Sequence, residues 1–79
     1  MDLSTRAGRD VAYQLHPFTN LSQHQTSGPL VITSGKGIYV YDEQGREYIE
    51  GLAGLWCTGL GFGEERLVDA AARQMRKLP

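Results

Sequence analysis

The chain has little that would stabilise a small protein by itself. Its 79 residues include a single cysteine, Cys57, so no disulfide can form within the chain. Together with Cys57, the two histidines, His16 and His24, lack the spacing of a zinc site. A domain of this length is near the lower limit of what one apolar core can hold together. We therefore expect one small domain at most, with no metal site and no other compensation for its size.

The sequence also lacks an excess of charge of either sign and any long apolar run. Its net charge is −1, with acidic and basic residues interspersed, which argues against a nucleic-acid surface or an anchor for anionic membranes. No apolar stretch approaches the length of a membrane span, and the polar N-terminus lacks the apolar centre of a signal peptide. We expect a cytoplasmic protein without a nucleic-acid or membrane partner.

Glycine is the residue that the chain has in abundance, and it is concentrated in one segment. Residues 51–63 read Gly-Leu-Ala-Gly-Leu-Trp-Cys-Thr-Gly-Leu-Gly-Phe-Gly and contain the only tryptophan, Trp56. Glycine this dense makes poor helix and poor strand, and it is used where the backbone turns sharply or approaches another group closely. We interpret Trp56 as the wall of a pocket in a much larger enzyme.

Local patterns predict an α+β segment. Ser4 or Thr5 can cap a short helix over about 5–13, and residues 16–29 follow neither a helical nor a strand period, which predicts a long loop. Three apolar or β-branched runs, separated by glycine-containing turns, predict an antiparallel meander with strands at 30–33, 38–41 and 46–50. Residues 64–78 have the apolar spacing of an amphipathic helix.

These elements cannot cover all of the apolar side chains. Burying one such side chain contributes about 1.5–3 kcal/mol, so leaving several exposed is unfavourable, and an exposed apolar surface usually marks a missing partner. The apolar residues of the glycine-rich segment are Leu52, Leu55, Trp56, Leu60 and Phe62. We therefore expect an N-terminal fragment of a longer protein. A self-standing, noncatalytic module that binds a protein partner through Trp56 is the alternative of another class.

Several motifs in order resemble the N-terminal segment of class III (omega) aminotransferases. The first is His-Pro-Phe-Thr at 16–19, and the second is Gly-Lys-Gly-Ile-Tyr-Val-Tyr-Asp at 35–42 with Gly45 after it. Gly-Leu-Trp-Cys at 54–57 follows, then glycines at 59 and 61, and finally an alanine-rich helix that carries Gln74. Each motif alone is weak, but the order and spacing cover most of the chain, from about 16 to 79.

The resemblance implies a fold type I, pyridoxal-phosphate-dependent enzyme that acts as a homodimer. The run at 54–57 looks most like amine:pyruvate aminotransferases, which transfer an amino group from an amine or ω-amino acid to pyruvate. By this resemblance, substrate-binding residues are expected at four positions: Phe18, Leu52, Leu55 and Trp56. The partners implied are a small-molecule amine, a keto acid, the remainder of the enzyme and a second subunit.

The resemblance also divides the chain and places the chemistry outside it. Residues 1–15 are expected to form an N-terminal arm with a short helix, 16–29 a loop, and 30–79 the first part of the small domain with the glycine-rich pocket segment. The resemblance implies that the large catalytic domain lies outside these residues. The family's cofactor-holding lysine and most cofactor ligands lie downstream, so no catalytic or cofactor-binding residue is assigned, and the chain alone is not expected to be active.

Some alternatives stay open at the level of sequence. The His-Pro-Phe-Thr motif also occurs in diaminopelargonate aminotransferases of biotin synthesis, and a decarboxylase or another fold type I enzyme is a weaker option. Many class III members have glycine-histidine where this chain has Gly61-Phe62. Glycines at 59, 61 and 63 do not match the dinucleotide-binding spacing, and Cys57 has no base partner nearby in the sequence, so neither is interpreted as a reactive site.

Overall fold

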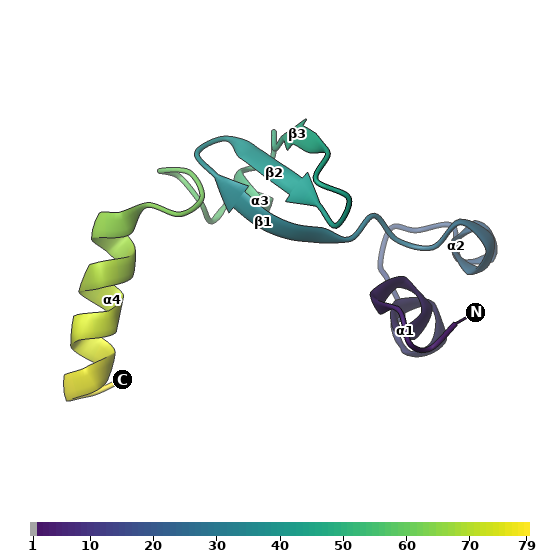
Figure 1. Cartoon of the computed structure of the whole chain (residues 1–79), viewed down its shortest axis with the longest axis horizontal. Helices are drawn as coiled ribbons and strands as arrows, with labels where there is room; N and C mark the ends of the chain where they lie inside the picture. The colour runs from purple at the N-terminus through teal and green to yellow at the C-terminus, as the bar shows by residue number, and fades with distance from the viewer. Residues whose placement is uncertain (1) are drawn as a thin grey trace. The chain divides into compact units, whose positions relative to one another are not determined.

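The computed structural model describes residues 2–79 and divides the chain into two compact units, Met1–Val31 and Ile32–Pro79 (Figure 1). The N-terminal unit contains helices α1 (Arg6–Tyr13) and α2 (Leu21–Ser27). The second unit contains strands β1 (Ile32–Lys36), β2 (Tyr39–Asp42) and β3 (Glu47–Ile49), the short turn α3 (Ala53–Trp56) and helix α4 (Glu65–Lys77). The predicted α+β composition is confirmed.

Helix α1 begins where the sequence predicts. The Gly8 backbone N–H donates to Thr5 Oγ1 at 2.9 Å, so Thr5 supplies the N-cap. Gly8 itself is buried, and a Cβ at this position would lie 1.7 Å from the backbone oxygen of Asp2. The first turn of α1 therefore tolerates only glycine at this position.

The prediction of a loop over 16–29 is wrong for seven of its residues, which form helix α2. Asn20 caps this helix through its side chain, which accepts from the Gln23 N–H at 3.2 Å, and Gly28 ends it with a φ of 70°. The segment between these two residues is mostly polar, so it has no apolar period to reveal a helix. The capping residues Asn20 and Gly28 are therefore the features of the sequence that indicate this helix.

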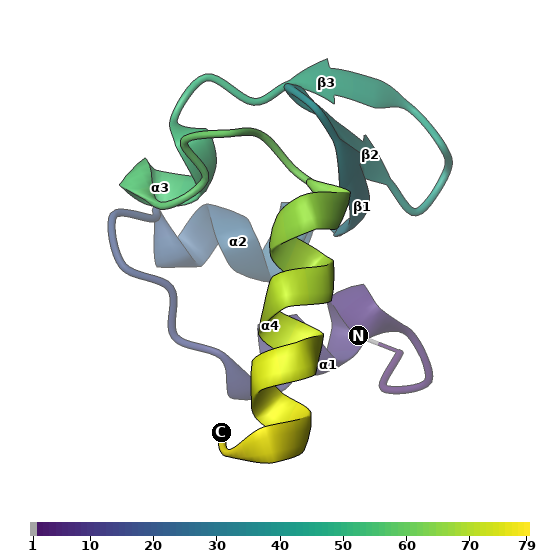
Figure 2. The ribbon, with the colours of Figure 1, turned by 90° about the vertical axis from the view of Figure 1, so that its left-hand side faces the viewer.

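The antiparallel meander is confirmed, with the strand order β1-β2-β3 (Figure 2). Strand β1 lies further along the chain than predicted, because residues 34–36 continue the ladder opposite Tyr41, Val40 and Tyr39 instead of forming a turn. The register shifts between Ile32 and Ser34, as at a β-bulge. Gly45, in the turn after β2, has a φ of 82°, a left-handed conformation that glycine adopts readily.

The glycines of the β1–β2 hairpin allow a later segment to approach it closely. Gly37 and Phe62 exchange backbone hydrogen bonds of 2.8 and 2.9 Å and form a β-bridge. Above them the Phe62 ring covers Gly35, where a Cβ would lie 2.9 Å from the ring. At Gly61, which has a φ of 90°, a Cβ would lie 2.8 Å from the Gly37 carbonyl oxygen. The absence of side chains at Gly35 and Gly61 is therefore a packing requirement. It lets the end of the glycine-rich segment lie directly on the sheet.

Asp42, at the end of β2, is the most thoroughly bonded side chain of the sheet. The residue as a whole is only 2 % exposed. Oδ1 accepts from the backbone N–H groups of Gln44 and Arg46, both at 2.9 Å. Oδ2 accepts from Arg46 Nε at 2.7 Å and from the Tyr48 hydroxyl at 2.9 Å. One side chain therefore closes the β2–β3 turn from both sides.

These bonds determine the ionisation of Asp42. Desolvation raises the pKa of the carboxyl, but the donors outweigh it: the Arg46 backbone N–H, the Tyr48 hydroxyl, the Arg46 side chain and the Gln44 backbone N–H. The pKa is held at about 2. Because it is depressed, the stabilisation from the ionised form is present above the unfolded value of about 3.9 and is lost as the pH falls toward 2.

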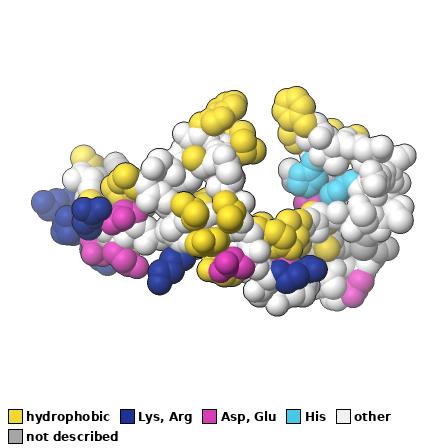
Figure 3. Space-filling view, turned by 90° about the horizontal axis from the view of Figure 1, so that it is seen from above, with side chains coloured by type: hydrophobic (Ala, Val, Ile, Leu, Met, Phe, Trp, Pro, Cys, Tyr) yellow, Lys and Arg dark blue, Asp and Glu magenta, His cyan; other side chains and the backbone are white. Residues whose placement is uncertain are grey.

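Helix α4 confirms the predicted amphipathic helix, with its bounds shortened by one residue at each end. No residue of α4 is buried among the residues that the structure describes. Its apolar side chains Leu67, Val68 and Met75 are all more than half exposed. Hydrophobic side chains are also exposed elsewhere on the chain, as the space-filling view shows (Figure 3). The excess of apolar surface expected from the sequence is therefore present.

The Asp42 network predicts the outcome of removing one hydroxyl. We expect the Asp42 carboxyl to titrate near pH 2 in the folded chain, and Tyr48→Phe to raise that pKa, because one donor to Oδ2 is lost. Tyr41→Phe is the matched control, since the Tyr41 hydroxyl donates to Glu47 instead. Carboxyl-carbon NMR titration measures both. An Asp42 midpoint near the unfolded value of about 3.9 in the parent chain would contradict the network.

The close approach of two glycine segments predicts a sharp contrast between neighbouring glycines. Gly61→Ala should lower the free energy of unfolding by more than about 1 kcal/mol, because it adds both a backbone clash and a left-handed alanine. Gly59→Ala should have little effect, since nothing lies within 4 Å of a Cβ there. Thermal melts of the protein containing this chain compare the two variants. Equal losses in both would show that the Gly61 contact with Gly37 is not formed.

Candidate functional site

The glycine-rich segment folds into an unusual turn immediately after β3. The φ angles of Ala53, Gly54, Leu55 and Trp56 are 48°, 60°, 62° and 74°, so four successive residues have a left-handed backbone. The Trp56 N–H donates to the Leu52 oxygen, and the N–H groups of Cys57 and Thr58 donate to the Ala53 oxygen, all at 2.8 Å. The element α3 is therefore one hydrogen-bonded turn of opposite hand to an ordinary helix.

This turn is strained because only one of its four residues is glycine. An L-residue in the left-handed helical conformation costs about 1–2 kcal/mol. Among the described residues, four that are not glycine have a positive φ: Phe18, Ala53, Leu55 and Trp56. Such strain clusters at ligand clamps and active sites, where the surrounding structure holds it in place.

Glu50 holds the turn at its first residues. Its Oε1 accepts from the Leu52 backbone N–H at 2.8 Å, and its Oε2 accepts from the Gly54 backbone N–H. The Glu50 N–H donates to the Ile38 oxygen at 2.9 Å, which ties the residue to the sheet. Glu50 therefore links the strained turn to the sheet, through its carboxylate on one side and its backbone N–H on the other. Sequence reasoning assigned no role to Glu50, and its only signal was an acidic residue directly before the glycine-rich segment.

The four predicted substrate-binding residues are all exposed. Phe18 lies in the N-terminal unit, between α1 and α2, with a φ of 52°. Leu52, Leu55 and Trp56 lie in the second unit, and their exposed fractions are 63, 65 and 84 %. The structure brings these last three residues together on one turn.

A hollow of about 540 Å³ lies beside this turn, between the hairpin and the glycine-rich segment. It is lined by Gly37, Ile38, Glu50, Gly51, Ala53, Thr58, Gly59, Leu60 and Gly61. The predicted substrate-binding residues do not line it. The lining is mainly backbone and small side chains, so its shape depends on the hydrogen bonds of Glu50 and on the Gly37–Phe62 bridge.

The reactive side chains of this region are in ordinary surroundings. Cys57 is a free, exposed thiol that donates to the Gly54 carbonyl oxygen at 2.8 Å. Lys36, at the end of β1, and Lys77, at the end of α4, are both exposed. A lysine that forms a Schiff base is usually activated by desolvation or by a neighbouring cation. No described residue of this chain therefore fits the role of holding pyridoxal phosphate covalently.

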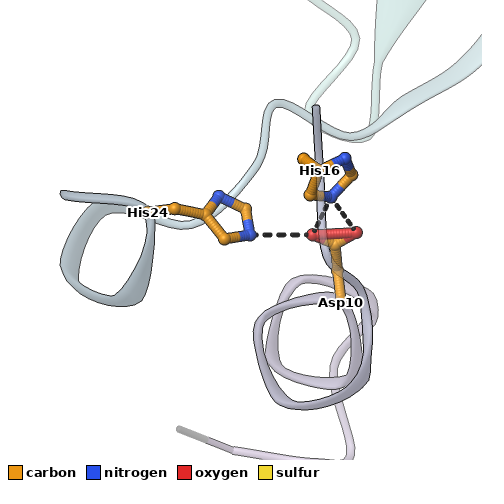
Figure 4. Close-up of side chains that lie close together, drawn as sticks. All are labelled: Asp10, His16 and His24. Atoms are coloured by element: carbon orange, nitrogen blue, oxygen red, sulfur yellow. Dashed lines mark hydrogen bonds and ion pairs between the residues drawn. The ribbon is translucent and has the colours of Figure 1, made fainter. Parts of the chain in front are cut away.

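A second cluster lies wholly in the N-terminal unit. Asp10 on α1, His16 after α1 and His24 on α2 converge, with both Asp10 oxygens 2.7 Å from His16 Nε2 (Figure 4). His24 Nε2 lies 3.1 Å from Asp10 Oδ2. No pattern in the sequence groups Asp10 with the histidines, because it is the fold of the α1–α2 connection that brings them together.

Comparison with known proteins identifies the family. The model of the class-III aminotransferases matches residues 21–79, which is most of the chain. The chain belongs to the class-III aminotransferase family. It spans only about 15 % of the length of the curated relatives and solved structures that it matches.

Two curated relatives illustrate the range of the family. A putrescine–pyruvate aminotransferase of Pseudomonas aeruginosa is 45 % identical over 67 residues, covering 85 % of this chain and 15 % of that protein. A mitochondrial gamma-aminobutyrate transaminase of Solanum lycopersicum is 55 % identical over 65 residues, covering 82 % of this chain and 13 % of that protein. Both relatives are aminotransferases, so the chain is part of an enzyme family.

Solved structures of omega transaminases have the same local fold. The crystal structure of the omega transaminase of Pseudomonas jessenii, in complex with PMP, matches with a TM-score of 0.87 and 53 % identity. The match covers 95 % of this chain and 17 % of the P. jessenii chain. A thermostable omega transaminase with a tryptophan replaced by glycine has a TM-score of 0.88 at 53 % identity over the same shares, and was engineered for synthesis of enantiopure bulky amines. The described residues of this aminotransferase segment include no helix long and apolar enough to cross a membrane.

The bracing of the strained turn by Glu50 can be measured directly. We expect Glu50→Ala to speed hydrogen exchange at the Leu52 and Gly54 amides by about tenfold or more, because hydrogen bonds to charged groups contribute about 1.5–3 kcal/mol. Glu47→Ala is the control, since Glu47 accepts from the Tyr41 hydroxyl and from no amide of the turn. Exchange followed by mass spectrometry on the intact enzyme reports both. Unchanged exchange at the two amides contradicts the assigned role.

Proposed function

We propose that this chain supplies part of the substrate-binding region of a pyridoxal-phosphate-dependent omega aminotransferase. The reaction proposed for the intact enzyme is transfer of an amino group from an amine or ω-amino acid to pyruvate. The cofactor provides the electron sink for this transfer and is held by residues outside this chain. The chain itself contributes binding surface and no reacting group.

One observation carries this proposal. Three of the four residues expected to bind substrate, Phe18, Leu55 and Trp56, are also among the four described non-glycine residues with a left-handed backbone. The motifs are a property of the sequence and the backbone angles a property of the fold, and both single out the same three residues. A strained backbone that carries exposed apolar side chains lowers the stability of the fold. Its presence is well explained if those side chains are presented to a ligand.

The relatives support the same class of substrates. Putrescine is a diamine and gamma-aminobutyrate is an ω-amino acid, and these are the amino donors in the names of the two relatives. Both donors carry a primary amine at the end of a short aliphatic chain. An apolar wall formed by Leu52, Leu55 and Trp56 suits such a chain. The engineered tryptophan-to-glycine structure supports the assignment of Trp56, the only tryptophan of this sequence, to the wall that limits amine size.

We also infer that the exposed apolar residues of α4 and of the turn pack against the remainder of the enzyme and a second subunit. The leucine, valine and methionine side chains of α4 are more than half exposed within the described chain. Homodimerisation through these surfaces is the arrangement that we propose. The noncatalytic interaction module is the competing explanation of the same exposure.

The test replaces Trp56 in the intact enzyme. Trp56→Ala should shift the ratio of kcat/KM values toward bulky amines by about tenfold or more, as expected for removal of a large apolar contact. Pyridoxal phosphate affinity should not change, because no reacting group is altered. The measurement is steady-state kinetics with pyruvate and a series of small and bulky amines.

Tyr13→Ala is the control, because Tyr13 is an exposed aromatic residue on α1 outside the glycine-rich segment. Its ratio of kcat/KM values should remain that of the parent. An identical ratio in Trp56→Ala and the parent would remove Trp56 from the substrate pocket. Absence of any amine–pyruvate exchange in the intact enzyme would refute the proposed reaction and favour the interaction module.

A further inference from the structure

The cluster of Asp10, His16 and His24 contains a buried polar atom, His24 Nε2, that has no hydrogen-bond partner among the described residues. The His24 side chain is 8 % exposed, and its Nε2 makes no hydrogen bond with any residue that the structure describes. This nitrogen lies 3.1 Å from Asp10 Oδ2 but without the alignment of a hydrogen bond. Leaving a buried polar group unsatisfied costs about 1–3 kcal/mol, so such an atom requires an explanation.

The orientation of the three side chains suggests what the His24 nitrogen binds. In Figure 4 the Nε2 atoms of both histidines face the Asp10 carboxylate from different sides. One possible ligand atom from each residue lies within 4.8 Å of the others. The two rings are 4.9 Å apart, centroid to centroid, with an interplanar angle of 71°, so they converge edge to face and do not stack.

We propose that Asp10, His16 and His24 bind a divalent transition-metal ion of the zinc class. Two imidazole nitrogens and one carboxylate oxygen form a recognised three-residue ligand set for this ion. Metal–ligand bonds of about 2.0–2.1 Å in a tetrahedral site place ligand atoms about 3.3 Å apart. The present separations of 2.7 and 3.1 Å therefore need to open by less than about 1 Å.

The surroundings leave room for a fourth ligand and an entry path. His16 is 34 % exposed, and with His24 it lines an open hollow whose other walls are Thr19, Gly28, Pro29 and Leu30. A water molecule from this hollow completes the tetrahedron. The ion then connects α1, the segment after α1 and α2, so the proposed role is to fix the fold of the N-terminal unit.

A simple ion-pair cluster explains the geometry less completely. Asp10 accepts from His16 Nε2 through both oxygens at 2.7 Å, which accounts for His16 without a metal. The same explanation is weaker for His24, because its buried Nε2 lies within ion-pair distance of the carboxylate, at 3.1 Å, but makes no hydrogen bond with it. A metal ion satisfies all three ligands at once and uses the His24 nitrogen that makes no hydrogen bond. This inference does not depend on the aminotransferase reaction.

The experiment uses Co²⁺ as a visible probe on the intact, metal-stripped enzyme that contains this chain. We expect uptake of one Co²⁺ per chain with the ligand-field absorbance of a tetrahedral nitrogen–oxygen site, and displacement of that signal by Zn²⁺. His16→Ala, at the half-exposed ligand, should weaken binding by tenfold or more. His24→Ala and Asp10→Asn should do the same.

Asp69→Asn, an exposed carboxylate on α4, is the control and should leave Co²⁺ uptake unchanged. Circular dichroism of each variant checks folding, and His16→Ala is the decisive variant because His16 is the most exposed of the three ligands, at 34 % against 22 % for Asp10 and 8 % for His24. The proposal is overturned if the parent takes up no Co²⁺ at micromolar concentration, or if the folded His16→Ala variant binds it as tightly as the parent.

Discussion

The carboxylate of Asp42 is the interaction on which the sheet of this chain depends. It is nearly inaccessible to solvent and accepts four hydrogen bonds, from two backbone amides, a guanidinium and a phenol. Within the described chain, Val40 is the only buried hydrophobic side chain, so apolar packing contributes little to the sheet. A buried charge is stabilising only when it is paired and hydrogen-bonded, and Asp42 meets both conditions. The meander is therefore held by a polar centre in place of an apolar core.

The glycine-rich segment is attached to that sheet at both of its ends. At the start, Glu50 accepts from the Leu52 and Gly54 amides, and at the end Phe62 forms a bridge with Gly37. Between these anchors the chain adopts a left-handed turn that free L-residues avoid. Strain of this kind persists only where surrounding contacts determine it. The sheet thus serves as the support for the exposed Leu55 and Trp56 side chains, which we propose to contact substrate.

The N-terminal unit is organised around a different polar cluster. Asp10 contacts both histidines, and the cluster joins helix α1 to helix α2 and to the segment between them. Helices of seven and eight residues are marginal in water without tertiary support. Each unit of this chain therefore uses a carboxylate with several partners where a larger domain would use a core. This is consistent with a segment whose apolar surfaces are covered by other parts of a protein.

The local sequence determined the meander, the amphipathic helix and the family. Strand runs, turn glycines and helical spacing depend on a few adjacent residues, and the ordered motifs identified an aminotransferase. The sequence did not reveal α2, because its caps at Asn20 and Gly28 lack an apolar pattern between them. It also did not reveal Glu50, the left-handed backbone at Trp56 or the grouping of Asp10 with His16 and His24. These features depend on hydrogen bonds and close contacts that exist only once the chain has folded, so tertiary structure alone decided them.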